Sequence, residues 1–442
     1  MAGAMCAQMC RQDVADSSSS ASPSSVGSTG RRLHPPKPPF PGPGADPLPG
    51  GRPLGGPRAR GALGEGRLVA VPNAPHGHAQ RTELALRRLH RLIAPRFARA
   101  EPRDRAFAFL RGMVLSADRR NGRQLAENAG EARPDGMQRL LTTARWDADE
   151  LRDDLRGIVV EHFGDPRAAL VLNEEAFAKK GDRSVGVRRQ FSAAAGGVEN
   201  CQVAVFLTYA APRAQAIVDR ELYLPPEWAG DPVRRARAHV PADVPYRSRG
   251  RLGWEMVERA LDARTPAAWV AAEAPFGHDA ALRGRLDERG VPYVLGVRTE
   301  PRSRSRQDGR RPRGVPEDAI ASIPANEWQR TVHHDDPVRH GLAGHAARVL
   351  LGRPGGDGLE RWLLVRRDGR GTRAYVCAAP RATSLRELAE VARQAERAPL
   401  CAAAARREVG LDHYEVRLWR AWYRYITLGL LAHAGVTLAA AA

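Results

Sequence analysis

Few residues of this sequence have types and spacing that could support chemistry. The stretch 333–336 contains two histidines followed by two aspartates, all of them potential metal ligands. Adjacent side chains on a charged, irregular loop diverge, so we favour a solvated segment over a metal site. Lys179 and Lys180 precede a glycine and place two cations on one turn. Such a pair either stays solvated, which is the common outcome, or contacts the phosphate groups of a polyanion.

The cysteines do not form a recognisable site. None of Cys6, Cys10, Cys201, Cys377 and Cys401 belongs to a CxxC pair or lies at zinc-ligand spacing from a histidine. An odd number of scattered cysteines argues against a disulfide framework. The first residues also lack the long apolar core of a secretory signal. The sequence therefore predicts a cytoplasmic protein.

The charge balance favours a polyanionic partner. The 442 residues carry 69 Lys+Arg against 50 Asp+Glu, a net charge of +19. An excess of this size is typical of proteins that bind nucleic acid. Only three residues are lysines, however, and alanine, glycine and proline are abundant. Because a GC-rich coding sequence inflates arginine whatever the function, charge alone gives only a modest preference for nucleic acid.

The sequence divides into segments that differ in composition and in the spacing of their apolar residues. Residues 1–65 are rich in serine, proline and glycine and cannot bury enough apolar surface to order, so we predict a disordered tail. Residues 81–160 repeat apolar residues at helical spacing and predict a compact helical domain. Short apolar runs then predict strands at 169–172, 184–191, 201–209 and 216–224.

Further along the chain, helices and strands alternate and predict a mixed sheet in an α/β fold. The expected helices are 251–264 and 279–289, and the expected strands are 267–271 and 292–297. Residues 298–358 are charged and predict an irregular region. An Asp-Gly pair at 368–369, between apolar runs, predicts a hairpin. Ser384 and Glu387 have the spacing of a capping box that opens a helix.

The last part of the sequence is apolar. The run 426–442 is slightly short for a membrane span and rich in alanine, so we predict a buried core helix and no membrane contact. Trp419, Trp422 and Tyr423 could stack on DNA bases. Their helical spacing before an apolar helix favours a place in the core instead.

Several segments share their sequence and spacing with one known family. They are RNG and QLAE within 120–127, PDGMQRLL at 134–141, RWD at 145–147, KKG and SVGV within 179–187, ENCQV at 199–203 and EVGLDHYEVR at 408–417. In this order they resemble the bacterial DDE-type DNA transposases of the insertion-sequence 701 family. The resemblance covers about residues 81–434, and only the stretch 298–358 matches poorly.

The resemblance implies a fold and a reaction. A ribonuclease-H-like mixed sheet with flanking helices would follow an all-helical, DNA-binding N-terminal domain. Such enzymes cut double-stranded DNA at the element ends and join the freed 3′-hydroxyl to target DNA, and homo-oligomers are compatible with this reaction. The expected parts are the tail at 1–65, the helical domain at 81–160, the catalytic domain at 165–300, a variable insertion at 301–360 and the end of the catalytic domain at 361–442.

In this family two aspartates and a glutamate hold two divalent ions, and Mg²⁺ is the implied cofactor. The first acid corresponds to Asn173, a neutral amide. The second corresponds to Glu273, which is one methylene longer than aspartate. The third falls on Pro399, which should also break its helix, and Glu408 and Glu415 are alternatives for it. Glu273 would be the one remaining metal ligand, so Mg²⁺ fits this acid set poorly.

Neighbouring residues complete the expected site. Glu174 follows the first acid position, but successive side chains on a strand point to opposite faces, so Glu174 would need a bulge to substitute. The DNA-binding residues that the resemblance predicts are Lys179, Lys180, Arg145 and Arg406.

The sequence thus predicts a DNA transposase-family protein whose catalysis is impaired. The alternative is a non-catalytic, DNA-binding remnant or domesticated regulator. A nuclease with a rearranged acid set is a third interpretation. DNA binding without cleavage would separate the second interpretation from the other two.

Overall fold

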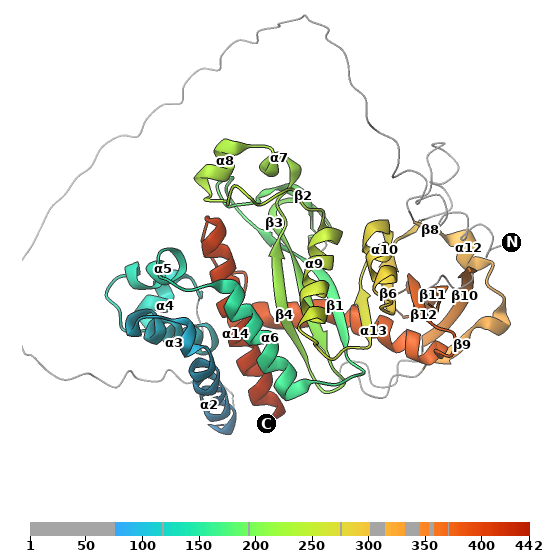
Figure 1. The fold of residues 1–442 in the computed structure, drawn as a ribbon, viewed down its shortest axis with the longest axis horizontal. Helices are drawn as coiled ribbons and strands as arrows, with labels where there is room; N and C mark the ends of the chain where they lie inside the picture. Colours follow the sequence, from blue (N-terminus) through green and yellow to red (C-terminus); the bar gives the residue numbers. More distant parts are fainter. Residues whose placement is uncertain are drawn as a thin grey trace, which may run out of the picture. The chain divides into compact units, whose positions relative to one another are not determined.

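The computed structural model describes most of the chain beyond the N-terminal tail (Figure 1). The tail predicted at 1–65 and the stretch 333–336 lie outside the described residues. The described ranges are 76–116, 119–192, 195–274, 276–300, 314–331, 344–352, 358–369 and 371–442.

The first described part is helical, as the leucine spacing predicts. Its helices are α2 (His76–Ile93), α3 (Ala100–Leu115), α4 (Gly122–Asn128), α5 (Asp135–Thr142) and α6 (Ala148–Phe163). Two of these helices begin at a capping side chain. Asn121 Oδ1 accepts the backbone N–H of Gln124 at 3.1 Å, and Asp147 Oδ1 accepts that of Asp149 at 2.6 Å. These caps satisfy backbone donors that a helix start would otherwise leave unpaired.

A mixed sheet follows, and its strands have the order β2-β3-β1-β5-β6-β12-β11-β10-β9, with β4 on β3. The strands are β1 (Ala169–Ala178), β2 (Arg188–Ser192), β3 (Gly197–Ala210), β4 (Gln215–Leu222), β5 (Trp269–Ala272), β6 (Tyr293–Val297), β9 (Gln329–Thr331), β10 (Gly344–Gly352), β11 (Leu359–Asp368) and β12 (Gly371–Pro380). A separate short pair consists of β7 (Thr299–Glu300) and β8 (Val315–Pro316).

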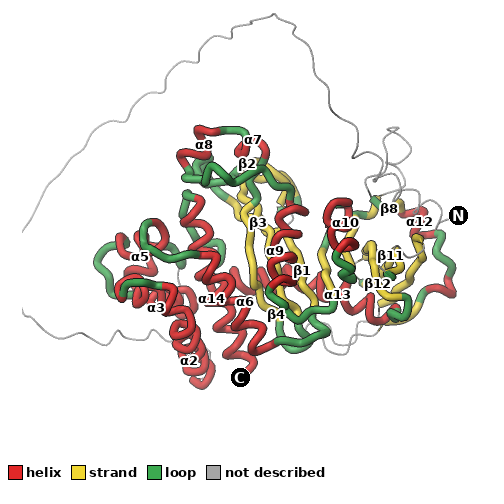
Figure 2. The backbone as a smooth tube through the Cα atoms, in the orientation of Figure 1, coloured by secondary structure: helices red, strands yellow, loops and turns green. Residues whose placement is uncertain are grey.

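The central five strands carry the expected fold. β3 is antiparallel to β1 and β4 is antiparallel to β3, whereas β5 and β6 are parallel to β1. The order β4-β3-β1-β5-β6 is that of a ribonuclease-H-like sheet, so the predicted fold class is confirmed. Helices flank this sheet (Figure 2). The helices beyond α6 are α7 (Pro226–Ala229), α8 (Pro232–Arg237), α9 (Arg249–Asp262), α10 (Ala280–Glu288), α12 (Glu317–Ala321), α13 (Leu385–Val409) and α14 (Trp419–Ala441). Of these, α9, α13 and α14 pack on the central strands.

The region 298–358 is less irregular than predicted. Its described parts contain β7, β8, α12, β9 and β10, and the last two extend the main sheet beyond β11. These strands are hard to recognise in the sequence because they are short or irregularly patterned: the buried residues of β10 are Gly344, Ala346, Ala347 and Leu351, which do not alternate with exposed ones. The predicted hairpin is confirmed: Asp368 of β11 pairs with Gly371 of β12. Gly371 has a φ of +116°, a conformation that only glycine adopts readily.

The helix α13 (Leu385–Val409) begins as predicted but does not end where predicted. Ser384 Oγ accepts the backbone N–H of Glu387 at 3.1 Å, as expected at such a cap. The expected break at Pro399 is wrong, because the helix continues through this residue. Both halves of α13 are buried, with Ala398 and Ala402 fully covered. This burial offsets the roughly 3 kcal/mol cost of an interior proline.

The helix α14 (Trp419–Ala441) lies in the core, as predicted. Trp422 and Tyr425 are buried, and the helix packs against α2, α3, α5, α6 and β4. By length and composition alone it could cross a membrane, but 72% of its most apolar window is buried inside the protein. One hydrophobic cluster includes residues from α2, the sheet and α14.

A buried histidine on α14 should make the stability of the fold depend on pH. Burial lowers the pKa of His433 to about 4, although a carboxylate oxygen of Glu408 lies 3.6 Å from Nε2. Between this value and about 6.5 the unfolded chain binds more protons than the folded chain. The free energy of unfolding therefore rises with pH across this window and should fall by about 3 kcal/mol from pH 7 to pH 4.

Urea unfolding of the wild type, His433→Asn and the exposed-site control His345→Asn at several pH values tests this expectation. The wild type and the control should lose stability in parallel on acidification, whereas His433→Asn should lose distinctly less. Identical pH profiles for all three proteins would contradict it.

Candidate active site

The positions expected for the first two acids lie side by side in the sheet. β1 and β5 are parallel, and Leu172 pairs with Ala272. The next residue on each segment is Asn173 or Glu273, so the two side chains start from neighbouring backbone positions. Asn173 is only 1% exposed. Its Oδ1 is buried without a hydrogen-bond partner in the described part of the protein.

Two glutamates follow Asn173 on β1 and lie on opposite faces of the sheet. Glu174 forms an ion pair of 2.7 Å with Arg249 of α9. Glu175 instead lies on the face of Asn173, whose Nδ2 donates to Glu175 Oε1 at 3.3 Å. The pairing of β1 with β3 is unbroken from Ala169 to Ala178. The bulge that Glu174 would need is therefore absent from β1.

Glu175 was not among the residues singled out from the sequence. Its alternation with Asn173 was the available signal, because residues i and i+2 of a strand share a face. Arg406 of α13 contacts the Glu175 carboxylate and donates from Nη2 to the carbonyl oxygen of Ala176 at 3.0 Å. Burial raises the pKa of Glu175, and the neighbouring Arg406 opposes this effect. Arg406, expected to contact DNA, is thus engaged inside the protein.

Glu273 lies just beyond the end of β5. Burial, together with the nearby charges of Glu396 and Glu175, raises its pKa to about 7, and Arg373 acts in the opposite direction. The described residues give the Glu273 side chain no hydrogen bond or ion pair, and only its backbone carbonyl accepts one, from Phe276 N–H at 3.3 Å. A Cβ atom added to Gly296 of β6 would lie 2.5 Å from the amide nitrogen of Ala274, so glycine at this position permits the close approach of the Glu273 segment.

Glu396 of α13, which the sequence did not indicate, is close enough to Glu273 for its charge to raise the pKa of Glu273. Glu396 lies one helical turn before Pro399, on a similar side of the helix. Tyr375 donates its hydroxyl to Glu396 Oε1 at 2.7 Å. Two arginines of the β11–β12 hairpin contact the same carboxylate: Arg366 directly, and Arg373 through Nη1 at 3.5 Å. Counting back from Glu408 along the family motif leads to Pro399 and so stops three residues short of this glutamate.

The two alternatives for the third acid lie elsewhere. Glu408 is twelve residues beyond Glu396 on α13, about 18 Å along the helix, and it pairs with His433 of α14. Glu415 accepts a hydrogen bond of 3.2 Å from Asn121 Nδ2 of the helical part. The structure therefore brings Asn173 and Glu273 together with Glu175 and Glu396, and it groups neither Glu408 nor Glu415 with them.

This arrangement does not fit a pair of divalent ions. Two such ions need several carboxylate ligands with open coordination positions. Here one ligand position is an amide, and the carboxylates of Glu175 and Glu396 are engaged by arginines. In the part of the chain that the structure describes, no group of three His, Cys, Asp or Glu side chains could hold a metal ion.

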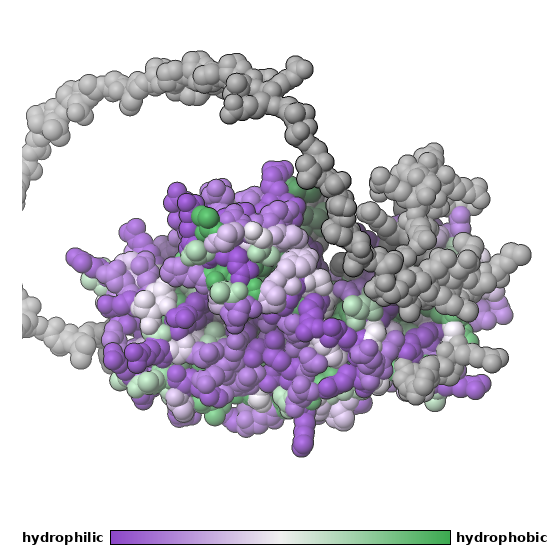
Figure 3. All heavy atoms as spheres, turned by 45° about the horizontal axis from the view of Figure 1, so that its top comes forward, coloured by the Kyte–Doolittle hydropathy of each residue, from purple (hydrophilic) through white to green (hydrophobic). Residues whose placement is uncertain are grey.

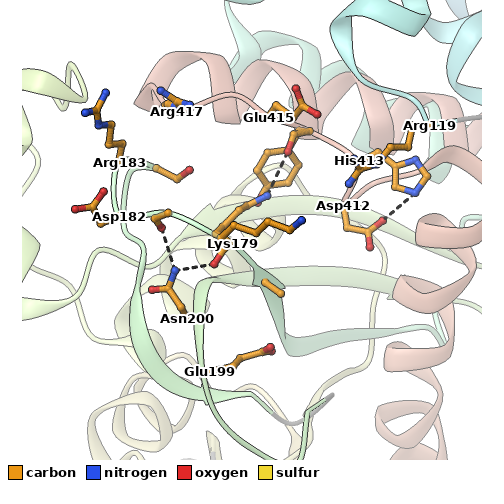
Figure 4. A pocket seen from close by; sticks show the side chains of 15 residues that line it. Arg119, Lys179, Asp182, Arg183, Glu199, Asn200, Asp412, His413, Glu415 and Arg417 are labelled. Carbon is orange, nitrogen blue, oxygen red and sulfur yellow. Dashed lines mark hydrogen bonds and ion pairs between the residues drawn. The ribbon is translucent and has the colours of Figure 1, made fainter. Parts of the chain in front are cut away.

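A groove lies where the turn after β1 meets the segment before α14 (Figure 4). We call it the basic groove, with a volume of about 720 Å³. Its cationic residues are Arg119, Lys179, Lys180, Arg183 and Arg417, and its acids are Asp182, Glu199, Asp412 and Glu415. The predicted DNA contacts Lys179 and Lys180 lie here, whereas Arg145 is exposed on the loop between α5 and α6.

The turn that carries Lys179 and Lys180 is held by hydrogen bonds from the side chain of Asn200. Asn200 Nδ2 donates to the carbonyl oxygens of Lys179 and Gly181, at 2.7 and 3.0 Å (Figure 4). The ammonium of Lys179 lies 3.4 Å from the centre of the Tyr414 ring and donates to the Tyr414 carbonyl at 3.3 Å. Burial lowers the pKa of Lys179 to about 8, although Asp412 and Glu415 act in the opposite direction. Lys180 is exposed at the rim.

Comparison with known proteins agrees with the fold. A family model described as DDE superfamily endonuclease matches residues 92–340, which is more than half of the chain. No curated protein matches the sequence. The matched range includes the helices α3 to α6, all five central strands and the positions of Asn173 and Glu273. The chain therefore belongs to the DDE superfamily endonucleases, and its central sheet is the ribonuclease-H-like core of that family.

Proposed function

We propose that this protein is a DNA-binding member of the insertion-sequence 701 transposases whose strand cleavage and transfer are impaired. One observation carries the proposal: Asn173 replaces the first acid, and the nearby Glu175 and Glu396 are engaged by arginines. Family membership itself implies a nucleic-acid substrate. We propose double-stranded DNA as that substrate, and cytoplasmic action without a membrane.

Divalent ions supply the charge that stabilises phosphoryl transfer in this family. The residues of this chain supply little of what such ions need. Asn173 offers one neutral acceptor oxygen, and the bond from its amide to Glu175 fixes its orientation. Arg366 and Arg373 already neutralise Glu396. These arginine contacts offset the negative charge of the buried carboxylates without a metal ion, which is compatible with DNA binding without cleavage.

The basic groove gives the DNA backbone a place to bind. Lys180, Arg183 and Arg417 are exposed in it, and exposed cations of this kind contact phosphates without reading the sequence of the bases. The groove also contains acids, so its net charge is small. The rest of the molecule supplies further cations, and most of the face visible in Figure 3 is hydrophilic.

Duplex binding should depend steeply on salt through this groove. Each phosphate that the protein neutralises contributes about −0.9 to the slope of log K against log salt. Replacing Lys180, Arg183 and Arg417 by alanine should therefore reduce the slope by about 0.9 for each residue that contacts a phosphate. Fluorescence anisotropy of a labelled duplex at several salt concentrations measures both slopes.

Arg386→Ala is the matched control, because Arg386 is equally exposed but lies at the start of α13, outside the groove. Its slope should equal that of the wild type. A salt-independent isotherm, or no binding even at low salt, would rule out the proposed DNA contact.

A non-catalytic regulator remains the second candidate. Arginines contact the carboxylates of Glu175 and Glu396. This arrangement favours the regulator, because carboxylates that are already paired with arginines are compatible with a protein that binds DNA and does not cut it. Tight duplex binding without cleavage, in the presence of Mg²⁺ or Mn²⁺, would support this candidate over an active nuclease.

A further inference from the structure

A second cavity opens directly beside Glu273. Its volume is about 450 Å³, and its walls come from the segment after β5, the end of β6 and the start of β12. The residues that matter to its chemistry are Glu273, Arg298, Thr299, Thr372 and Arg373. Two guanidinium groups and two hydroxyls thus face one carboxylate. This composition favours an anion over a cation.

Arg373 is held in place from one side. Its Nη1 donates to Asp368 Oδ2 at 2.9 Å and lies 3.5 Å from Glu396 Oε1. No described residue accepts a hydrogen bond from Nε or Nη2, and the side chain is 29% exposed. These two donors form the flat edge of the guanidinium, which matches two oxygens of a phosphate group. The carboxylates behind the group fix its orientation before any ligand arrives.

Arg298 stands on the other side of the cavity mouth. Its backbone N–H donates to His278 Nε2 at 2.8 Å, which anchors the chain where it leaves β6. The side chain is exposed and takes part in no hydrogen bond with the described residues. Its positive charge opposes the effect of burial on the pKa of Glu174, and the side chain can turn toward a ligand without breaking a hydrogen bond.

We propose that this cavity binds a phosphate of the DNA backbone directly through Arg373 and Arg298, without a metal ion. The inference rests on the DNA binding proposed above and adds the mode of contact at the former catalytic centre. In this interpretation, guanidinium groups supply the positive charge that divalent ions supply in active members of the family. The exchange would preserve the docking of DNA at the sheet while removing the metal that cleavage requires.

The test is anisotropy of a fluorescein-labelled duplex with the full-length protein, in EDTA and in Mg²⁺. At matched ionic strength we expect binding in EDTA to be at least as tight as in Mg²⁺, because Mg²⁺ itself competes for the DNA phosphates. Arg298→Ala and Arg373→Ala should each weaken binding about tenfold, because each removes a charge-assisted hydrogen bond. Arg373→Lys should also weaken binding, since lysine keeps the charge but loses the flat edge. Arg381→Ala is the control, being 90% exposed just after β12 and outside the cavity.

Arg298→Ala keeps the test sound if variants of Arg373 fold poorly, because Arg298 has no side-chain hydrogen bond to lose. Wild-type affinity for both Arg298→Ala and Arg373→Lys, or binding that EDTA abolishes, would overturn the inference while duplex binding itself stood. Absence of duplex binding by the wild type would overturn both the inference and the proposed function.

Discussion

A DNA substrate that carries the element's own ends should remain uncut when the unmodified protein is added with Mg²⁺ or Mn²⁺. Removing a single preorganised stabiliser of a transition state typically lowers the rate by about 10²–10³-fold. A carboxylate that bridges two metals should matter at least as much, and the family motifs assign two such positions to Asn173 and Pro399. Because these acids would act together at one site, the rate reductions caused by losing each of them do not simply multiply.

The triple variant Asn173→Asp, Glu273→Asp, Pro399→Glu is the informative comparison. It restores the family acids at the positions that the motifs assign, and it removes an interior proline from α13. We expect detectable cleavage only with this variant. Strong cleavage by the unmodified protein that disappears in Glu408→Ala or Glu415→Ala would show that the working acids lie elsewhere.

The second large effect concerns stability, and it is expected at Asp219. This side chain of β4 is completely buried. Arg152 of α6 donates to it at 3.3 Å, and Arg259 of α9 lies within 3.0 Å. Replacing Asp219 by alanine would leave these buried or half-buried cations without their shared partner. Breaking a buried ion pair in this way typically costs about 3–5 kcal/mol.

Chemical unfolding followed by circular dichroism measures this loss. Glu227→Ala is the control, because Glu227 also pairs with an arginine, Arg188 at 2.8 Å, but both side chains are largely exposed. The control should unfold close to the wild type. An Asp219→Ala protein as stable as the control would mean that the network contributes nothing to the fold.

Local patterns were sufficient to predict much of the fold. The apolar runs of the sheet, the Asp-Gly hairpin and the cap at Ser384 depend on neighbouring residues, and the structure confirms them, except that the strand predicted at 184–191 begins only at Arg188. The strand β10 escaped prediction because its buried positions, Gly344, Ala346, Ala347 and Leu351, lack the alternation typical of a half-buried strand. The continuity of α13 through Pro399 escaped it as well, because the burial that stabilises this helix comes from strands distant in the sequence.

The site was less accessible to sequence reasoning. Motif spacing led to Asn173 and Glu273, which the structure places on neighbouring strands. It could not lead to Glu175 and Glu396, because their importance comes from proximity and from the arginines that contact them. The catalytic roles assigned to Asn173, Glu273 and Pro399 stay predictions, since geometry alone does not test them.

The packing of α14 has a consequence for synthesis of the chain on the ribosome. The helices α2, α3, α5 and α6 emerge early, yet they cover their apolar faces against α14, which is translated hundreds of residues later. Until then those faces must remain exposed or be held by chaperones. A premature stop before Trp419 should therefore leave even the first helices prone to aggregation. Copies of this gene shortened at the 3′ end would not produce a free, folded unit of the N-terminal helices.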